Sequence, residues 1–185
     1  MPNTMVKFEL FLNTNYVSMP EVVQIGIDDT VVLDTVMPLD HVKFECDLAD
    51  NEHVLWIELC DKHSTNEYRI NGQLENDTFI DIKNISINGS MMNHLLNDNA
   101  YVIPDWQHHP DVALWFQENK GFVPERLEKS KYLNFKGRYC FHFSLPIRDY
   151  LNRNISIHPE YVSLYNESLE RYSQLENRLA SFKNI

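Results

Sequence analysis

Apolar and polar side chains alternate along much of the first third of this chain. The alternation is clearest in Val42–Leu48, where every second side chain is apolar, and it recurs in Val54–Leu59 and Val6–Leu10. A period of two directs one set of side chains to a buried face and the other set to solvent. The pattern therefore predicts antiparallel strands that are covered on one side, as in a β-sandwich or barrel, with no helix among residues 5–62.

Turn signals bound the expected strands. We expect strands at 5–12, 22–27, 30–36, 41–48, 53–61 and 78–87. Asp28-Asp29 suits a tight hairpin turn between the second and third of them. The fourth and fifth strands are expected to form another hairpin. Asn88-Gly89 is a strong turn signal that ends the strand over 78–87.

Residues 90–128 interrupt the alternation. Their periodicity is weak, and they hold two of the three tryptophans and the pair His108-His109. We expect a long excursion from the sandwich with short strands at 101–103 and 112–116, and long excursions often carry function. Beyond it, 131–135 and 138–145 are expected to form a hairpin.

The last part of the chain has helical periodicity. We expect a helical turn from Pro146 to Leu151 and then a helix from about Pro159 to Lys183. Two interpretations stay open for this helix: a coiled-coil strand that docks onto another subunit, or an amphipathic helix packed on its own domain. The candidate interface positions are Tyr165, Leu169, Tyr172, Leu175, Leu179 and Phe182. The expected organisation is a β-sandwich domain over 1–150, with its excursion at 90–128, and a C-terminal linker and helix over 151–185.

Charge is unevenly distributed along the chain. The formal net charge of the 185 residues is −11, and residues 1–60 hold eleven acids and two bases. Such a surface repels nucleic acid and anionic lipid, so we expect neither as a partner. Residues 120–138 instead hold six bases and two acids. That asymmetry suits packing between acidic and basic faces of neighbouring subunits, although a solvated hairpin rim explains it equally well.

No targeting segment is apparent in the sequence. The chain lacks a run of about 20 apolar residues that would span a bilayer, and the N-terminus lacks the basic and apolar regions of a signal peptide. The three cysteines, Cys46, Cys60 and Cys140, are widely spaced and form no CxxC pair. We interpret them as reduced packing residues, as expected of a protein assembled in a cytoplasm.

Motifs for catalysis or metal binding are missing from the sequence. There is no nucleophile elbow and no phosphate-binding glycine loop, so we expect no enzyme activity. The eight histidines have no compact ligand spacing. Asp28, Asp29 and Asp34 could offer oxygen ligands to calcium, but turn chemistry and solubility explain them better. We therefore expect no cofactor and place no calcium site.

Aromatic residues of the excursion offer one candidate binding surface. Trp106 and Trp115 could stack on sugar rings or anchor a protein interface, together with Phe116 and Phe122. The alternative, which we prefer, is that these rings are buried and form a second small core. Trp56 lies in a strand pattern and is expected in the main core.

Two segments carry a resemblance to a known family. The run IGIDDTVVLDTVMPLDHVKFECDLADNEHVLWIELCDK, with Asn51–Leu59 inside it, and the run DTFIDIKNISING resemble parts of the jelly-roll family of calcium-dependent carbohydrate-binding modules. The resemblance covers roughly residues 5–90 and implies a jelly-roll-like sandwich. The family's calcium ligands have no matching positions here. Similar modules occur in structural proteins of contractile-tailed bacteriophages.

These observations lead to two functional expectations. The first is a non-enzymatic structural protein of a tailed-phage virion, made in the host cytoplasm, with other virion proteins and copies of itself as partners. The alternative is a carbohydrate-binding module that serves host or glycan recognition, with Trp106 and Trp115 as its stacking residues.

Overall fold

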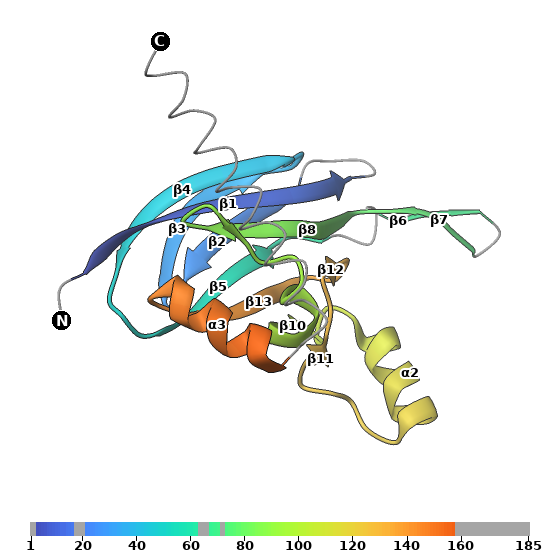
Figure 1. Ribbon diagram of the computed structural model, residues 1–185. Helices are drawn as coiled ribbons and strands as arrows, with labels where there is room; N and C mark the ends of the chain where they lie inside the picture. The colour runs from blue at the N-terminus through green and yellow to red at the C-terminus, as the bar shows by residue number, and fades with distance from the viewer. Residues whose placement is uncertain (1–2, 17–20, 63–66, 71–72, 158–185) are drawn as a thin grey trace, which may run out of the picture. The chain divides into compact units, whose positions relative to one another are not determined.

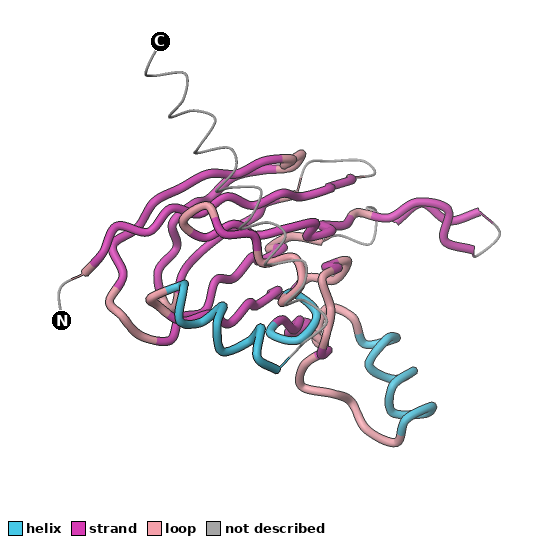
Figure 2. Tube along the Cα trace, in the orientation of Figure 1, coloured by secondary structure: helices cyan, strands magenta, loops and turns pink. Residues whose placement is uncertain are grey.

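The computed structural model describes residues 3–16, 21–62, 67–70 and 73–157. The chain divides into two compact units, Met1–Ile147 and Arg148–Ile185. The first unit is mainly β, and its strands and short helices can be followed in Figures 1 and 2.

Two antiparallel sheets form a sandwich within the first unit. Sheet A has the order β12 (Tyr132–Leu133), β8 (Phe79–Ile87), β1 (Thr4–Asn15) and β4 (His41–Leu48), and the short β9 (Ser90–Met91) also pairs with β8. Sheet B has the order β11 (Leu127–Glu128), β10 (Ala100–Pro104), β13 (Gly137–Ser144), β5 (Glu52–Leu59), β2 (Val22–Ile27) and β3 (Thr30–Val36). A separate hairpin joins β6 (Glu67–Ile70) to β7 (Gln73–Asp77).

The main core lies between the two sheets. In β1 the buried side chains are Val6, Phe8, Leu10 and Leu12, and in β5 they include Leu55, Ile57 and Leu59. These are the apolar positions of the period-two pattern, and their burial is what holds the layers together. The chain passes from sheet to sheet as it proceeds, with β1 in A, β2 and β3 in B, β4 in A and β5 in B. The predicted antiparallel, jelly-roll-like sandwich is thus confirmed.

Strand positions were predicted better than strand partners. The strands expected at 22–27, 30–36 and 41–48 have those bounds, and β2 and β3 form the expected hairpin across Asp28-Asp29. The expected hairpin between 41–48 and 53–61 is wrong, because β4 pairs with β1 in sheet A whereas β5 pairs with β2 and β13 in sheet B. A turn signal marks a chain reversal, but it does not tell whether the chain changes sheet there.

The same error affects the hairpin expected between 131–135 and 138–145. In the structure β12 pairs with β8 in sheet A, whereas β13 lies in sheet B between β10 and β5. Residues 134–136 therefore carry the chain from one layer of the sandwich to the other.

The excursion contains more regular structure than expected. It holds α1 (Leu96–Asn99), β10 and α2 (Pro110–Lys120). The strand expected at 101–103 is confirmed in β10, but the strand expected at 112–116 is wrong, because those residues lie in α2. Pro110 begins the helix, where a missing N–H has no consequence, and Gly121 ends it at a φ of +80°.

The last described element is α3 (Ile147–Ile157), which is longer than the expected turn. The helix expected at 159–183 and its interface positions, from Tyr165 to Phe182, lie outside the described residues. In the described part of the chain, no helix is long and apolar enough to cross a membrane.

Candidate functional site

The outer face of sheet A gathers polar and aromatic side chains from four strands. Residues that are directly opposed in a ladder share a face. In the outward row that crosses β1, Phe11 is opposed by His41 of β4 and by Asn84 of β8. The equivalent row two positions along β1 joins Asn13, Asp81 and Tyr132. We call this surface the sheet A face; its residues are Glu9, Phe11, Asn13, His41, Lys43, Phe79, Asp81, Asn84 and Tyr132.

Two aromatic stacks lie on the sheet A face. The rings of Phe11 and His41 are stacked, with centroids 4.5 Å apart and planes 17° apart. Those of Phe79 and Tyr132 are also stacked, with a centroid distance of 5.1 Å and an angle of 30°. Tyr132 is 40% exposed. These rings lie at outward positions of amphipathic strands, where a side chain that served only the core would point the other way.

Polar side chains lie beside the two stacks. Asn13 is exposed, and it is directly opposed to Asp81, whose side chain is 18% exposed and contacts the Lys83 ammonium. Asn84 Oδ1 accepts a hydrogen bond of 2.8 Å from the Ile85 N–H, and Asn84 Nδ2 donates to Met91 Sδ at 3.3 Å. The sheet A face thus offers amide and carboxylate groups next to flat apolar rings.

Charges on the sheet A face are paired with one another. Glu9 accepts hydrogen bonds from His41 (3.0 Å) and from Lys43 (3.1 Å). Glu45, further along β4, contacts Lys7 at 3.5 Å. Hydrogen bonds from Lys43 and His41 hold the pKa of Glu9 below its ordinary value. Since each carboxylate has a cationic neighbour, the surface suits an uncharged ligand better than an ionic one.

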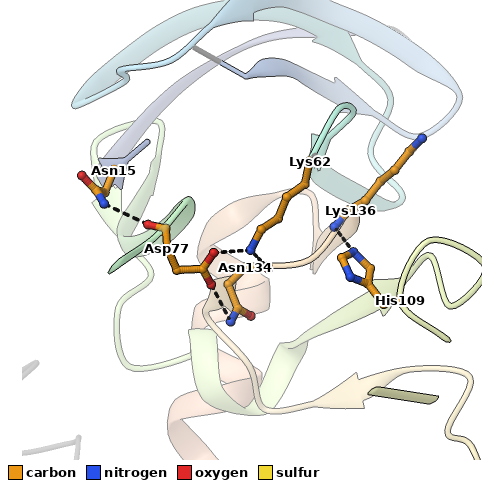
Figure 3. A network of polar contacts seen from close by, with 6 residues as sticks. All are labelled: Asn15, Lys62, Asp77, His109, Asn134 and Lys136. Carbon is orange, nitrogen blue, oxygen red and sulfur yellow. Dashed lines mark hydrogen bonds and ion pairs between the residues drawn. The ribbon is translucent and has the colours of Figure 1, made fainter. Parts of the chain in front are cut away.

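A buried polar network supports the Phe79–Tyr132 end of the sheet A face (Figure 3). The Lys62 ammonium donates to Asp77 Oδ1 and to the carbonyl oxygen of Asn134, both at 2.5 Å. Asn134 Nδ2 donates to Asp77 Oδ2 at 3.4 Å, and Asn15 Nδ2 donates to the Asp77 carbonyl oxygen at 2.8 Å. The side chain of Lys62 is 2% exposed and that of Asp77 11%.

The positions of these residues explain what the network does. Asp77 precedes Phe79 by two residues, Asn134 follows Tyr132 by two, and Asn15 is directly opposed to Phe79. The network around the Lys62 ammonium therefore joins the ends of β1, β8 and β12, and the last two of these strands carry the second aromatic stack. The oxygen atoms that converge there are already neutralised by an ammonium group, so their chemistry does not call for a metal ion.

The histidine pair of the excursion has structural contacts. His109 Nε2 accepts a hydrogen bond of 2.8 Å from the Lys136 N–H (Figure 3), and His108 Nδ1 lies 2.6 Å from Asp105 Oδ2. Among the described residues, no group of three or more His, Cys, Asp or Glu side chains is arranged to hold a metal ion.

The aspartates considered as calcium ligands lie in and beside the β2–β3 turn. Asp28 Oδ1 accepts from the Val54 N–H at 2.9 Å, and Asp28 Oδ2 lies 2.8 Å from His53 Nδ1. Asp34 Oδ2 accepts from Gln24 Nε2 at 3.3 Å. The contacts of Asp28 tie the turn to β5, in agreement with the turn role expected for it.

The three cysteines are free. Burial raises the pKa of each thiol, and for Cys46 and Cys60 neighbouring carboxylates raise it further. These surroundings disfavour the reactive thiolate.

The two tryptophans predicted to stack on a ligand differ in their surroundings. Trp106 is half-buried, its indole N–H donates to the Pro124 carbonyl oxygen at 2.7 Å, and its ring packs edge-on against Phe116. Trp115 is 50% exposed on α2. The structure thus places Trp106 in a half-buried aromatic cluster with Phe116 and Phe135 and leaves Trp115 on the surface.

Sequence reasoning did not find the sheet A face. The signal in the sequence is that Phe11 and Phe79 are aromatic residues at outward positions, in strands whose inward positions are already filled by apolar residues. That signal becomes specific only in the folded chain, where Phe11 is opposed to His41 in the ladder and the Phe79 ring stacks on Tyr132.

No family model matches the sequence, and no curated protein matches it. A solved structure described as "vCBM60 in complex with galactobiose" is similar at 10% identity and a TM-score of 0.41, over 75% of this chain and 97% of that one. A likeness at this TM-score has no bearing on the function or the site.

Proposed function

We propose that this chain is a non-catalytic carbohydrate-binding domain and that the sheet A face is its ligand surface. The observation that carries the proposal is the combination on one face of two aromatic stacks, Phe11–His41 and Phe79–Tyr132, with the polar side chains of Asn13, Asp81 and Asn84. Of the two functions that the sequence left open, this is the alternative.

The chemistry of a sugar explains why such a surface suits it. A pyranose ring has an apolar C–H face, which packs on an aromatic ring, and a rim of hydroxyl groups, which need hydrogen-bond partners. Amide groups supply those partners because they both donate and accept in one plane, and a carboxylate accepts from the hydroxyl groups. Because the charges of the face are paired, we propose a neutral glycan.

The surface around Trp115 is less suited to a sugar. Its exposed neighbours are Leu114, Phe122 and Val123, which offer no hydrogen bonds to hydroxyl groups. The amide groups of Gln117 and Asn119 donate to backbone carbonyl oxygens of the same segment. The other polar groups on its own helical face are the carboxylates of Asp111 and Glu118, which only accept hydrogen bonds and are both negatively charged, so this surface suits a neutral sugar less well than the sheet A face does. The virion role and virion partners stay predictions of the sequence.

The experiment is a screen of the full chain against immobilised neutral oligosaccharides, followed by titration calorimetry with the best ligand. Tyr132→Ala removes an exposed stacking ring, and Trp115→Ala is the matched control in the excursion. Loss of one stacking contact, about 1.4 kcal/mol, weakens binding about tenfold. We expect that loss for Tyr132→Ala, no change for Trp115→Ala, and the same affinity with and without a calcium chelator.

Two results would contradict the proposal. A chain that retains no oligosaccharide on the array lacks the proposed function. Binding that is lost in Trp115→Ala and kept in Tyr132→Ala would move the site to α2, as the sequence predicted, and would overturn the role given to the sheet A face.

A further inference from the structure

Strand β4 forms the border of sheet A (Figure 1). Among the described strands, it pairs with β1 and has no partner on its other side. Its register with β1 runs through eight positions without a bulge, and none of its residues is a proline. Prolines and bulges are two of the devices that keep an edge strand from pairing with another chain. The free edge of β4 therefore has the geometry of a strand that can accept a further strand.

The backbone groups on this free edge belong to alternate residues of β4. In an antiparallel ladder, the N–H and C=O groups of successive residues point to opposite sides of the strand. The Leu12 N–H donates to the Asp40 carbonyl oxygen at 2.8 Å, which fixes the alternation at the start of β4. The even-numbered residues of β4 therefore bond to β1, and the odd-numbered ones, from His41 to Asp47, direct their N–H and C=O groups to the free edge.

The outward side chains of β4 carry a self-complementary pattern of charge. In chain order they are His41, Lys43, Glu45 and Asp47, two residues of basic type followed by two acids, and all four are exposed. Consider β4 paired antiparallel with β4 of a second copy, with Phe44 opposed to Phe44. Lys43 of each copy is then opposed to Glu45 of the other. His41 is likewise opposed to Asp47, so all four contacts join opposite types.

The charge pattern selects this register among those that the backbone allows. Hydrogen bonding across the free edge requires odd-numbered residues to be opposed to one another. The two neighbouring registers that meet this requirement oppose Lys43 to Lys43 or Glu45 to Glu45. Like charges that are directly opposed destabilise a ladder. The register centred on Phe44 is therefore favoured over both.

The ion pairs within each copy continue across such a contact. Lys43 Nζ lies 3.1 Å from Glu9 Oε2, and Lys7 Nζ lies 3.5 Å from Glu45 Oε1; each pair is directly opposed in the β1–β4 ladder. The row across the contact then reads Glu9 and Lys43 of one copy, followed by Glu45 and Lys7 of the other, so the charges alternate in sign. The Lys43 side chain is 61% exposed and that of Glu45 51%, so both can be reached by a second copy.

The inward side chains of β4 offer apolar surface that a further strand would cover. Phe44 and Cys46 are half-buried, whereas Phe8 of the neighbouring strand is 1% exposed. Phe44 stacks on Phe8 with a centroid distance of 5.0 Å, so one side of its ring is already covered. In the register centred on Phe44, the two Phe44 side chains are opposed, and Cys46 is opposed to Val42 of the other copy. Burial of these groups favours the pairing.

We propose that two copies of this chain pair along β4 about a two-fold axis at Phe44, so that their A sheets become one continuous sheet. The occupant of the free edge is a second copy, and the contact is isologous, so assembly closes at a dimer. The paired stretch is 41–47, and the flanking acids Asp40 and Asp50 lie outside it. The proposal does not rest on glycan binding, because edge pairing leaves the sheet A face of each copy open.

Sedimentation velocity of the full chain over a range of concentrations tests the proposal. We expect a dimer and nothing larger. Lys43→Glu opposes two carboxylates across the axis, and Glu45→Lys opposes two ammonium groups, so each variant alone should dimerise about tenfold more weakly. Mixed in equal amounts, the two variants oppose unlike charges at both positions and should recover the dimer.

The controls for these variants make the same charge changes elsewhere. Glu118→Lys and Lys120→Glu alter exposed residues of α2, outside the proposed contact, and should leave the dimer unchanged. Thermal unfolding of every variant checks the fold.

Amide hydrogen exchange of the unchanged chain, followed by NMR, gives a second measurement that needs no variant. The N–H groups of Lys43 and Glu45 point to the free edge, so they should exchange slowly where the dimer forms and rapidly after dilution to monomer. The Phe44 N–H points to β1 and is the internal control, which should stay protected at both concentrations.

Four results would overturn the proposal. A chain that is monomeric at every concentration does not pair along β4. A dimer that is equally strong in Lys43→Glu and Glu45→Lys uses another surface, and a mixture of the two that stays monomeric excludes the register centred on Phe44. If the Lys43 and Glu45 amides are protected at every concentration and lose that protection when residues 158–185 are removed, the chain's own last residues occupy the edge.

Discussion

The Trp56 indole lies against the backbone of Gly26, in the space that a Cβ on residue 26 would occupy. Such a Cβ would stand 2.1 Å from Trp56 Cζ2, and the two residues are directly opposed in the β2–β5 ladder. The indole N–H donates to the Asp28 carbonyl oxygen at 2.7 Å, and the Arg138 guanidinium lies 4.1 Å from the ring centroid. Trp56 is therefore 3% exposed although it points away from the main core.

Gly26→Ala should destabilise the fold strongly. The added methyl group would meet the Trp56 ring and also the Thr30 carbonyl oxygen at 2.4 Å, and the backbone atom cannot give way as a flexible side chain would. Overpacking of this kind lowers the free energy of unfolding by about 1–3 kcal/mol or more. Urea denaturation of the variant and the unchanged chain measures the difference.

Gly89→Ala is the matched control for that prediction. Its φ is +79° and no atom lies within 4 Å of the added carbon, so only backbone strain of about 1–2 kcal/mol is expected. In a Trp56→Leu background, the loss caused by Gly26→Ala should shrink. An equal loss in both backgrounds would show that the indole is not what excludes a side chain at residue 26.

Asp28 makes a second testable contribution to this end of the sandwich. It has a φ of +51°, a conformation that Asp and Asn tolerate better than Ala. Asp28→Ala should lower the free energy of unfolding by about 2 kcal/mol or more, because it removes the hydrogen bond from the Val54 N–H and the contact with His53. Asp28→Asn keeps an acceptor and should lose less than half as much. Equal losses in urea denaturation would contradict this explanation.

The sequence predicted the layers of the fold but not the connections between them. Period-two patterns over 22–27, 30–36 and 41–48 locate strands because burial on one side imposes that period. Pairing depends on contacts between distant segments, such as β13 with β5, and a local pattern does not contain them. The segment 112–116 was misassigned because α2 buries none of its residues and so has no amphipathic period to detect.

The candidate site was less predictable still. The sequence draws attention to Trp115 because a tryptophan in an irregular segment is conspicuous; Trp115 is exposed, but it lies outside the sheet A face. The sheet A face was missed because its parts, such as Phe11 and Tyr132, come from strands that are distant in sequence. Lys62 was missed because its role depends on a network that closes only in the folded chain.

Lys62→Met should destabilise the fold by about 3–5 kcal/mol. The substitution removes the buried ammonium and leaves the Asp77 carboxylate without its cation, which is the costly way to break a buried ion pair. Thermal and urea unfolding measure the loss. Because the network holds the ends of β1, β8 and β12, any glycan affinity should fall as well.

Two further variants separate the ion pair from simple packing. Lys43→Met removes a lysine whose side chain is 61% exposed from its pair with Glu9, and it should change stability by less than about 1 kcal/mol. Lys62→Met combined with Asp77→Leu removes both charges and should recover part of the lost stability. If the double variant is less stable than Lys62→Met alone, the unpaired Asp77 carboxylate is not the cause of the stability lost in Lys62→Met.

The lowered pKa of Glu9 predicts how the free energy of unfolding depends on pH. Hydrogen bonds from Lys43 and His41 lower its pKa in the folded state below the ordinary value of 4.5. A carboxyl group of this kind binds protons more weakly in the folded protein than in the unfolded chain. Its stabilising effect is therefore complete at pH values above 4.5 and disappears as the pH falls through the folded pKa. Glu9→Gln should therefore reduce the urea midpoint at neutral pH and make its decline in acid shallower. The curves of the two proteins should converge at low pH, whereas a constant gap at all pH values would show that Glu9 acts through packing and not through its charge.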